Sequence, residues 1–293
     1  MERETHMVME NVFESTDCDL PIRQANTRLV KQNSECQQAI NKLREIEKFL
    51  EKFGFLTFGR DFVFEGTGQR TILFSSDKVM TSLELTMGSV IVCCESACIA
   101  DANTLVRKYR DDLFFYLYIS VYKSLDKHSE KAKSMLTNIT KWLNNDLSNF
   151  HIDRVLKAIA SAPQLSDAVM KYNLKESFQK IGAALNSYVH SNGYAYYNRN
   201  ANAYRENELS AELRKLEEKV RYMTIIFLLL LVLCSPVSVM STDYIDYLEV
   251  NETPPENSQY WVAPFVDQFI KENISLIDMN CLDYLRENTM MQL

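Results

Sequence analysis

The chain has 293 residues, a formal net charge of −7, 46% hydrophobic residues and 24% charged residues. Its seven glycines and six prolines are too few for an all-β fold with many tight turns, so a mainly α fold built from long helices is expected. The acidic excess lies in residues 241–293, which carry ten acidic and two basic side chains, whereas the first 240 residues are near neutral. This balance gives no strong nucleic-acid signal.

Seven cysteines, an odd number, are scattered along a chain that is too large to need disulfide staples, which predicts a reducing compartment for its N-terminal part. Three of them, Cys93, Cys94 and Cys98, are close enough in sequence to suggest a zinc site. Tetrahedral zinc usually takes its ligands from two separated pairs, and the sequence contains no CxxC partner. Small buried thiols on an apolar helix are therefore the preferred interpretation, and neither a metal nor a cofactor is predicted.

In chain order, residues 1–20 are expected to form a polar lead without the apolar core of a signal peptide. A helical domain follows over 21–204, because apolar residues recur at helical spacing through most of it. Within this domain, segment 55–76 is aromatic and β-branched and partly alternates around Gly66-Thr67-Gly68, which predicts a small β-hairpin. The expected helices are 21–53, 78–99, 101–124, 126–148, 151–161 and the region 164–190, with a loop over 194–204.

Residues 205–222 predict an amphipathic stalk helix. Its apolar residues, spaced four and three apart in the heptad pattern of a coiled coil, are Leu209, Leu213, Leu216 and Val220. Two heptads fit either of two arrangements: a homodimer or other protein partner bound through this seam, or one helix packed against its own domain. The sequence leaves both open.

The run TIIFLLLLVLCSPVSV, from Thr224 to Val239, contains no charged residue. Sixteen to eighteen helical residues span roughly 24–27 Å, which is near the lower limit for crossing a bilayer. We therefore predict one transmembrane helix over 223–240, in contact with the lipid bilayer. The alternative is a buried helix in a protein without a membrane span.

Basic residues precede the apolar run and acidic residues follow it, with no Lys or Arg between Arg221 and Lys271. The positive-inside rule then predicts a single-pass protein of the cell membrane, with the N-terminal domain in the cytoplasm and the tail outside the cytoplasm. The tail, 241–293, contains an amphipathic stripe that includes Phe265, Phe269 and Ile270. This stripe predicts a short helix that either lies on the outer membrane interface or docks on a partner, and its acidity favours a protein contact.

Two helices carry the candidate catalytic residues. In the helix over 101–124, Arg107, Arg110 and Asp111 fall between apolar residues, so they either form ion pairs on the helix surface or line a polar cleft. His190 ends the helical region 164–190, where a histidine suits the C-terminal end of the helix dipole. It also stands among tyrosines that, with it, could exchange protons or stack on a base.

An all-helical domain with the charged motif RKYRDD and a later Tyr-x-His at a helix end, YVH, resembles the HEPN-like helical domains of bacterial defence and toxin systems. The resemblance covers about residues 80–200. It implies either a helical nuclease or a binding, inactive version of that fold. Active HEPN nucleases carry an Arg followed four to six residues later by His, and here no arginine lies within six residues before His190.

The sequence contains no HExxH, GxSxG, Walker A or dinucleotide-binding fingerprint. It therefore favours a membrane-tethered helical protein with no assigned catalytic activity, which acts through protein–protein interaction as a sensor, adaptor or regulatory module. The alternative is a membrane-anchored HEPN-like nuclease or effector of a bacterial defence system that uses the four candidate residues.

Overall fold

The computed structural model describes residues 19–58, 62–67, 70–75, 77–144 and 152–293, so residues 1–18 of the predicted polar lead lie outside the described residues. Helices α2 (Asp19–Gln32) and α3 (Ser34–Thr57) replace the single helix predicted over 21–53. The break comes at Asn33, because its backbone is extended and its side chain accepts the Cys36 N–H at 2.9 Å, which caps α3.

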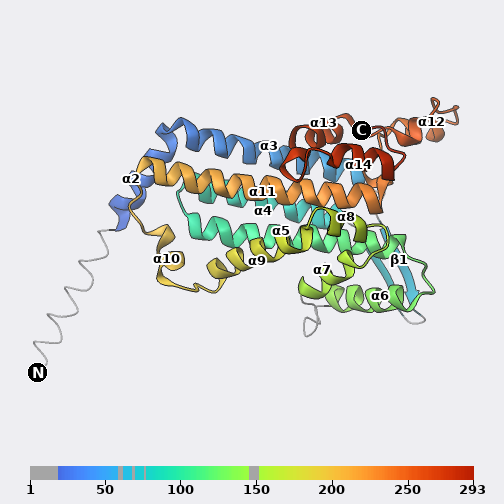
Figure 1. Cartoon of the computed structure of the whole chain (residues 1–293), viewed down its shortest axis with the longest axis horizontal. Coiled ribbons are helices and arrows are strands. Elements are labelled where there is room, and N and C mark those ends of the chain that lie inside the picture. Colours follow the sequence, from blue (N-terminus) through green and yellow to red (C-terminus); the bar gives the residue numbers. More distant parts are fainter. Residues whose placement is uncertain (1–18, 59–61, 68–69, 76, 145–151) are drawn as a thin grey trace, which may run out of the picture.

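Four long helices form the centre of the fold: α3, α4 (Asp77–Glu95), α5 (Ile99–Ser124) and α11 (Glu206–Cys234). Helix α3 packs on α4, α4 on α5, α5 on α11, and α11 again on α3, so the four close into a bundle (Figure 1). Their apolar faces meet in one continuous core. Helix α4 runs opposite to the other three.

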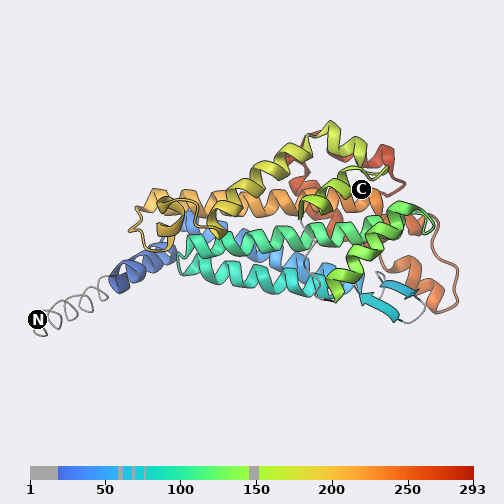
Figure 2. The same cartoon turned by 90° about the horizontal axis from the view of Figure 1, so that it is seen from below.

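Because α5 and α11 run in the same direction, a long connection has to carry the chain back to the start of the bundle. Helix α9 makes most of this return along α5 (Figure 2), with the Phe178 ring 4.6 Å from the Phe114 ring. The elements of the connection are α6 (Glu130–Leu143), α7 (Ile152–Ala160), α8 (Ser166–Lys171), α9 (Leu174–Val189), α10 (Tyr194–Tyr197) and the 3-10 turn η3 (Asn198–Asn200).

Between α3 and α4 the chain forms two short antiparallel strands, β1 (Phe62–Thr67) and β2 (Arg70–Ser75), with Phe62 opposite Ser75 and Thr67 opposite Arg70. This ribbon lies at the end of the bundle that is far from α2 (Figure 1). It adds no layer to the fold, which remains mainly helical.

The predicted transmembrane helix is wrong. Helix α11 ends at Cys234, because Ser235 leaves the helical conformation and Pro236 opens a separate 3-10 turn, η4 (Pro236–Val239). The uncharged part of α11, Tyr222 to Cys234, is roughly 20 Å long, short of the ~30 Å hydrocarbon core of a bilayer. Among the described residues, no helix combines the length and the apolar character that crossing a membrane requires.

The apolar run is instead the centre of the core. Every residue from Ile225 to Val232 is at most 1% exposed. Helices α3 and α5 cover the run on two sides, and the C-terminal helices cover it on a third. A helix that is apolar on all sides is typical of burial either in lipid or in a protein core, and here neighbouring helices of the same chain bury it. The predicted single-pass topology depended on this span and loses its basis.

The heptad seam is buried in the same core. Its residues Leu209, Leu213, Leu216 and Val220 are at most 1% exposed, and they pack against the chain's own helices. In the structure of the single chain the seam therefore packs on its own domain, the second of the two arrangements. The predicted boundary at residue 222 falls inside α11, where stalk and apolar run form one continuous helix.

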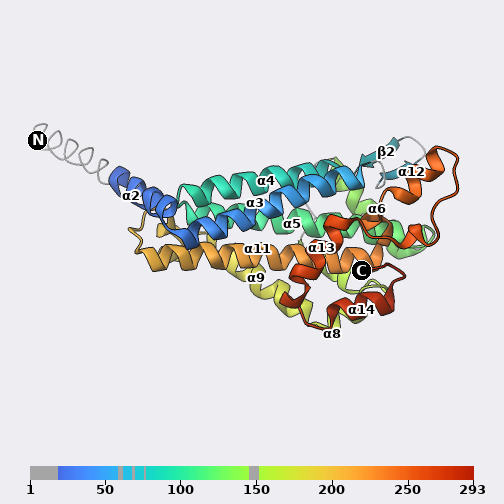
Figure 3. The same ribbon diagram turned by 90° about the horizontal axis from the view of Figure 1, so that it is seen from above.

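The acidic C-terminal segment folds back onto the bundle. Helix α13 lies across α3 and α11 (Figure 3), with Val266 and Ile270 of its apolar stripe fully buried and Phe265 and Phe269 half-buried. Part of the predicted docking stripe thus packs on the same chain. The elements of the segment are η4, α12 (Asp243–Glu249), η5 (Ser258–Tyr260), α13 (Pro264–Asn273), η6 (Ile274–Leu276) and α14 (Cys281–Asn288).

Candidate functional site

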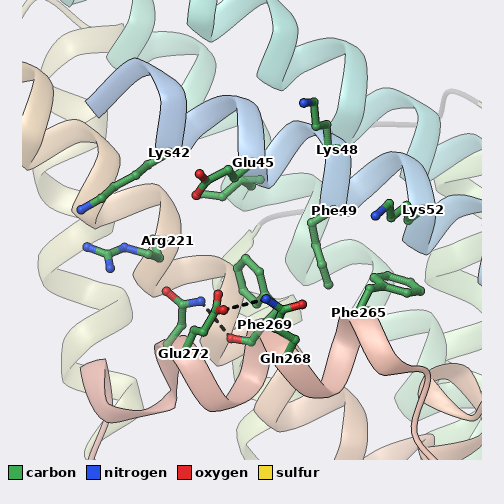
Figure 4. A pocket seen from close by; sticks show the side chains of 12 residues that line it. Lys42, Glu45, Lys48, Phe49, Lys52, Arg221, Phe265, Gln268, Phe269 and Glu272 are labelled. Carbon is green, nitrogen blue, oxygen red and sulfur yellow. Dashed lines mark hydrogen bonds between the residues drawn. The ribbon is translucent and has the colours of Figure 1, made fainter. Parts of the chain in front are cut away.

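A cleft of about 500 Å³ opens between α3 and α13, with α11 at one end (Figure 4). It exists because α13 docks on α3 by part of its surface only. Its lining combines aromatic rings with charged side chains from three helices that are far apart in the sequence. Apolar surface with a few convergent polar groups is the usual composition of a binding site.

Three phenylalanines form the floor of the cleft. The Phe49 ring of α3 stacks on the Phe269 ring of α13 at 4.4 Å between centroids and lies 5.7 Å from the tilted Phe265 ring. Phe49 is 5% exposed, whereas Phe265 and Phe269 are half-buried. The two rings of α13 therefore leave apolar surface that a ligand can cover.

Cationic side chains lie at both ends of this floor. Lys42 and Arg221 approach from α3 and α11 at one end, and Lys52 lies near Phe265 at the other (Figure 4). Lys48 also lines the cleft, although its ammonium group points away from α13. Among the described residues, Lys52 makes no salt bridge.

Acidic and amide groups lie between the cationic ends. Glu45 of α3 and Glu272 of α13 line the middle of the cleft, and the Gln268 amide donates to the Glu272 carboxylate at 2.8 Å. This bond orients both side chains along the surface of α13. Both carboxylates line the cleft, so they contribute to selectivity between charged ligands.

The Lys42 end of the cleft rests on a buried ion pair. Arg221 Nε lies 2.8 Å from Glu217 Oε1, and Glu217 is 1% exposed. Burial raises the pKa of the Glu217 carboxyl, and the positive charges of Arg221 and Lys42 oppose that rise. Arg221 is therefore held by its partner, whereas Lys42 is not fixed by a salt bridge within the described part of the chain.

The four residues predicted from the sequence lie elsewhere. The Arg110 side chain is 4% exposed, and its Nη2 and Nε donate to Asp111 Oδ1 at 2.6 and 2.8 Å. Arg107 is half-buried, and its Nε is buried without a hydrogen-bond partner among the described residues. His190 caps the C-terminal end of α9 and is exposed.

Arg110 and His190 are not brought together. The Arg110 guanidinium packs on Gly182 of α9, so closely that a Cβ at Gly182 would be 2.6 Å from Nη1. His190 lies eight residues beyond Gly182, so the two Cα atoms are roughly 12 Å apart along the helix axis. The α3–α13 cleft is lined by other residues. Arg110 and Asp111 thus form an internal ion pair against α9.

A second polar cluster joins α11 to the start of α5 and to η3. The Lys219 ammonium donates to Asn103 Oδ1 at 2.9 Å, and burial lowers the pKa of Lys219. Arg199 pairs with Glu212 at 2.6 Å. Each cation meets an acceptor on another element, so the cluster fixes α11 against its neighbours.

The described residues contain no group of three His, Cys, Asp or Glu side chains that could hold a metal ion. Within the predicted cysteine cluster, Cys94 is buried, whereas Cys93 and Cys98 are partly exposed. Comparison with protein-family models, with curated proteins and with solved structures finds no match for this chain.

Only one side of the cleft could be predicted from the sequence. The spacing of Phe265 and Phe269 indicates a docking face, but no pattern in the sequence marks Phe49 of α3 as its partner. Arg221 and Glu217, spaced four apart before the apolar run, were a detectable signal, because a helical ion pair next to a buried segment is itself half-buried.

Proposed function

We propose that this protein is a non-enzymatic interaction module whose α3–α13 cleft binds a segment of a protein partner. The segment carries an apolar side chain, which covers the rings of Phe265 and Phe269, and carboxylates, which meet Lys42, Arg221 and Lys52. The observation that carries the proposal is the position of Lys52, which has no salt-bridge partner among the described residues, beside the half-buried ring of Phe265.

The dimensions of the cleft fit a short peptide. Lys42 and Lys52 are ten residues apart on one helix, which corresponds to roughly 15 Å. Four or five residues of extended chain cover that length at about 3.3 Å each. An aromatic or branched side chain near the middle of such a segment reaches the phenylalanine floor, and its flanking carboxylates reach the cationic ends.

The electrostatic setting favours a specific contact over a general one. The protein has a net charge of −7, so an acidic partner experiences an overall repulsion. Cationic side chains at two points of one cleft then select for orientation as well as for charge. This arrangement suits a sensor, adaptor or regulatory module.

We do not propose the alternative of a HEPN-like nuclease. Such a reaction needs an acid–base group and a cation at one phosphate. Arg110 is engaged with Asp111 in the interior, while His190 is exposed at the far end of α9. We therefore do not assign a shared reaction centre to Arg110 and His190.

The test uses three fluorescein-labelled peptides and the full chain: Glu-Glu-Leu-Phe-Glu-Glu, the same peptide with Lys for each Glu, and one with Ser-Ser in place of Leu-Phe. We expect fluorescence anisotropy to show binding of the first peptide only, weakened by added salt. The pair Lys42→Gln and Lys52→Gln should weaken binding roughly tenfold, since each exposed charge pair contributes up to about 1 kcal/mol.

The matched control is the pair Lys31→Gln and Lys133→Gln, which removes the same charge from exposed positions on α2 and α6. It should leave the affinity unchanged. Phe265→Ala should weaken binding without unfolding the protein, because the ring is half-exposed. Equal binding of the acidic and basic peptides, or equal loss in the control pair, would contradict the proposal.

A further inference from the structure

The turn between α4 and α5 brings two cysteines together. The Cys98 N–H donates to the Cys93 carbonyl at 2.8 Å, and the Ala97 N–H donates to the Cys94 carbonyl at 3.0 Å. Ala97 has a φ of 56°, in the left-handed region. These three features define a Schellman turn, in which the residues at the positions of Cys93 and Cys98 face each other.

Covalent geometry limits the distance between the two cysteines. The 2.8 Å hydrogen bond joins the Cys93 oxygen to the Cys98 nitrogen. The oxygen is about 2.4 Å from the Cys93 Cα and the nitrogen about 1.5 Å from the Cys98 Cα, so the two Cα atoms are at most about 6.7 Å apart. Disulfides join Cα atoms that are about 4.4–6.8 Å apart, so a bond needs no large backbone movement.

Exposure separates this pair from its neighbours. Cys93 and Cys98 are partly exposed, while Cys36, Cys94, Cys234 and Cys281 are buried. Cys94, next in the chain to Cys93, is 0% exposed and points into the bundle core. A reagent in solution can therefore reach the two thiols that the turn brings together and not the third.

We propose that Cys93 and Cys98 are a reversible redox pair, which a small-molecule disulfide such as oxidised glutathione converts to an intramolecular disulfide. One thiolate attacks the reagent, forms a mixed disulfide and releases one glutathione thiolate. The second thiolate then attacks the protein sulfur of that mixed disulfide and releases the other glutathione. The two cysteines lose two electrons and two protons, and the reagent gains them as two molecules of reduced glutathione.

Burial raises the pKa of the Cys93 thiol, the nearby Asp101 carboxylate and Cys98 thiolate raise it further, and the charge of Arg23 lowers it. Exchange through Cys93 should therefore become faster as the pH rises and its thiolate fraction grows.

The bond would affect how α5 begins. Cys98 is the N-cap residue of α5, and the Ala100 N–H donates to the Asn200 side chain of η3 at 2.9 Å. A disulfide fixes the left-handed turn at Ala97 and with it the position of this contact. The pair lies on α4 and α5, which do not line the α3–α13 cleft, so the inference is independent of the proposed function.

The experiment incubates the full chain with oxidised glutathione, alkylates the remaining thiols and digests the product without reduction. A glutamate-specific protease cleaves after Glu95, between Cys94 and Cys98. We expect the peptides that contain Cys93 and Cys98 to stay covalently linked until a reductant is added, with Cys94 alkylated. The linkage should persist in Cys94→Ala and disappear in Cys93→Ser and in Cys98→Ser.

The Cys94→Ala variant keeps the result interpretable, because it removes the neighbouring thiol and leaves the turn residues unchanged. Circular dichroism of each variant shows whether the bundle still folds. A linkage that persists in Cys93→Ser and is lost in Cys94→Ala would assign the bond to Cys94 and overturn the proposal. Full alkylation of all three cysteines after oxidation, or only stable mixed disulfides with glutathione, would overturn it as well.

Discussion

The hydroxyl of Tyr109 on α5 lies 2.8 Å from the hydroxyl of Thr224 on α11, and both side chains are fully buried. The Thr224 hydroxyl donates to the Val220 carbonyl at 2.8 Å. Its single hydrogen is therefore used, and Tyr109 must be the donor in the bond between the helices. Thr224 is the first residue of the apolar run that was predicted to cross a bilayer, and this bond connects the start of that run to α5 in the protein core.

The two partners of this bond should respond unequally to mutation. Tyr109→Phe removes the donor and should cost about 1 kcal/mol of unfolding free energy, while Thr224→Val leaves a buried hydroxyl without an acceptor and should cost about 1–3 kcal/mol. Urea unfolding followed by circular dichroism measures both. The double variant should be more stable than the sum of the single effects implies. A larger cost for Tyr109→Phe than for Thr224→Val would contradict the assigned direction of the bond.

The central position of Phe227 predicts a large effect of truncation. Its ring lies edge-on to Tyr116 at 5.5 Å and to Phe53 at 6.2 Å between centroids. Phe227→Ala should lower the unfolding free energy by about 3–5 kcal/mol, because it leaves a cavity between three helices. Leu85→Ala on α4, where the side chain is 65% exposed, is the control and should change stability by less than about 0.5 kcal/mol. Similar effects of the two substitutions would argue against the packing.

Gly88 and Gly182 both lie inside helices, and the side chains that a Cβ would meet differ in their freedom to move. A Cβ at Gly88 would lie 2.7 Å from Oε1 of Glu47, the end of a flexible, half-buried side chain that can move away. A Cβ at Gly182 would lie 2.6 Å from Nη1 of Arg110, which is buried and held by Asp111. Alanine gains about 1 kcal/mol of helix propensity at either site.

Gly88→Ala should therefore be neutral or slightly stabilising, whereas Gly182→Ala should be destabilising by about 1–3 kcal/mol because overpacking exceeds the gain in propensity. Thermal unfolding of both variants measures the difference. The reverse order would mean that Arg110 has room to leave the surface of α9. A third variant, Gly182→Ala with Arg110→Ala, should recover the propensity gain at Gly182 relative to Arg110→Ala alone.

Glu217 predicts a dependence of stability on pH. Burial raises its pKa above the ordinary value of 4.5, so the folded protein binds this proton more tightly than the unfolded chain does. Its contribution to stability is fully present below about pH 4.5 and is lost as the pH rises through the folded pKa. The stability of the wild type relative to Glu217→Gln should therefore fall from pH 4 to pH 8, as measured by denaturant unfolding at a series of pH values.

Glu176→Gln is a control of opposite sign. Hydrogen bonds from Lys180 and Asn173 lower the pKa of Glu176, which is exposed at the start of α9. Its small contribution is present above pH 4.5 and is lost as the pH falls through the folded pKa. If both variants shift in the same direction with pH, a general effect of net charge explains the data and the specific role of Glu217 is wrong.

The helical character of the chain was predictable, because the apolar spacing of α3 and α5 extends over many turns. The environment of α11 was not, since a run that is apolar all round satisfies lipid and protein interior equally well. One local signal was present: Pro236 ends a helix at the preceding residue and shortens the run below the length of a span. The position of Pro236 therefore favours a buried helix over a transmembrane helix.

The candidate cleft was only partly predictable. The stripe that includes Phe265 and Phe269 indicated a docking face, but Lys42 and Arg221 meet only because α11 returns to α3. No local pattern specifies that return. For Arg110 and Asp111 the sequence allows either ion pairs on the helix surface or a polar cleft. The structure shows an ion pair that packs against Gly182, which no local pattern specifies.

The bundle can close only after the ribosome has synthesised α11. The start of α3 and the start of α11 are joined by a bond from the Asn33 amide to the Glu206 carboxylate, which spans 173 residues. At roughly 5–20 residues per second, a ribosome needs on the order of 10–35 s between making the two partners. Through that interval the inner faces of α3 and α5 have no α11 to cover them, so the nascent chain depends on α4 alone, or on a chaperone, to keep those surfaces from other chains.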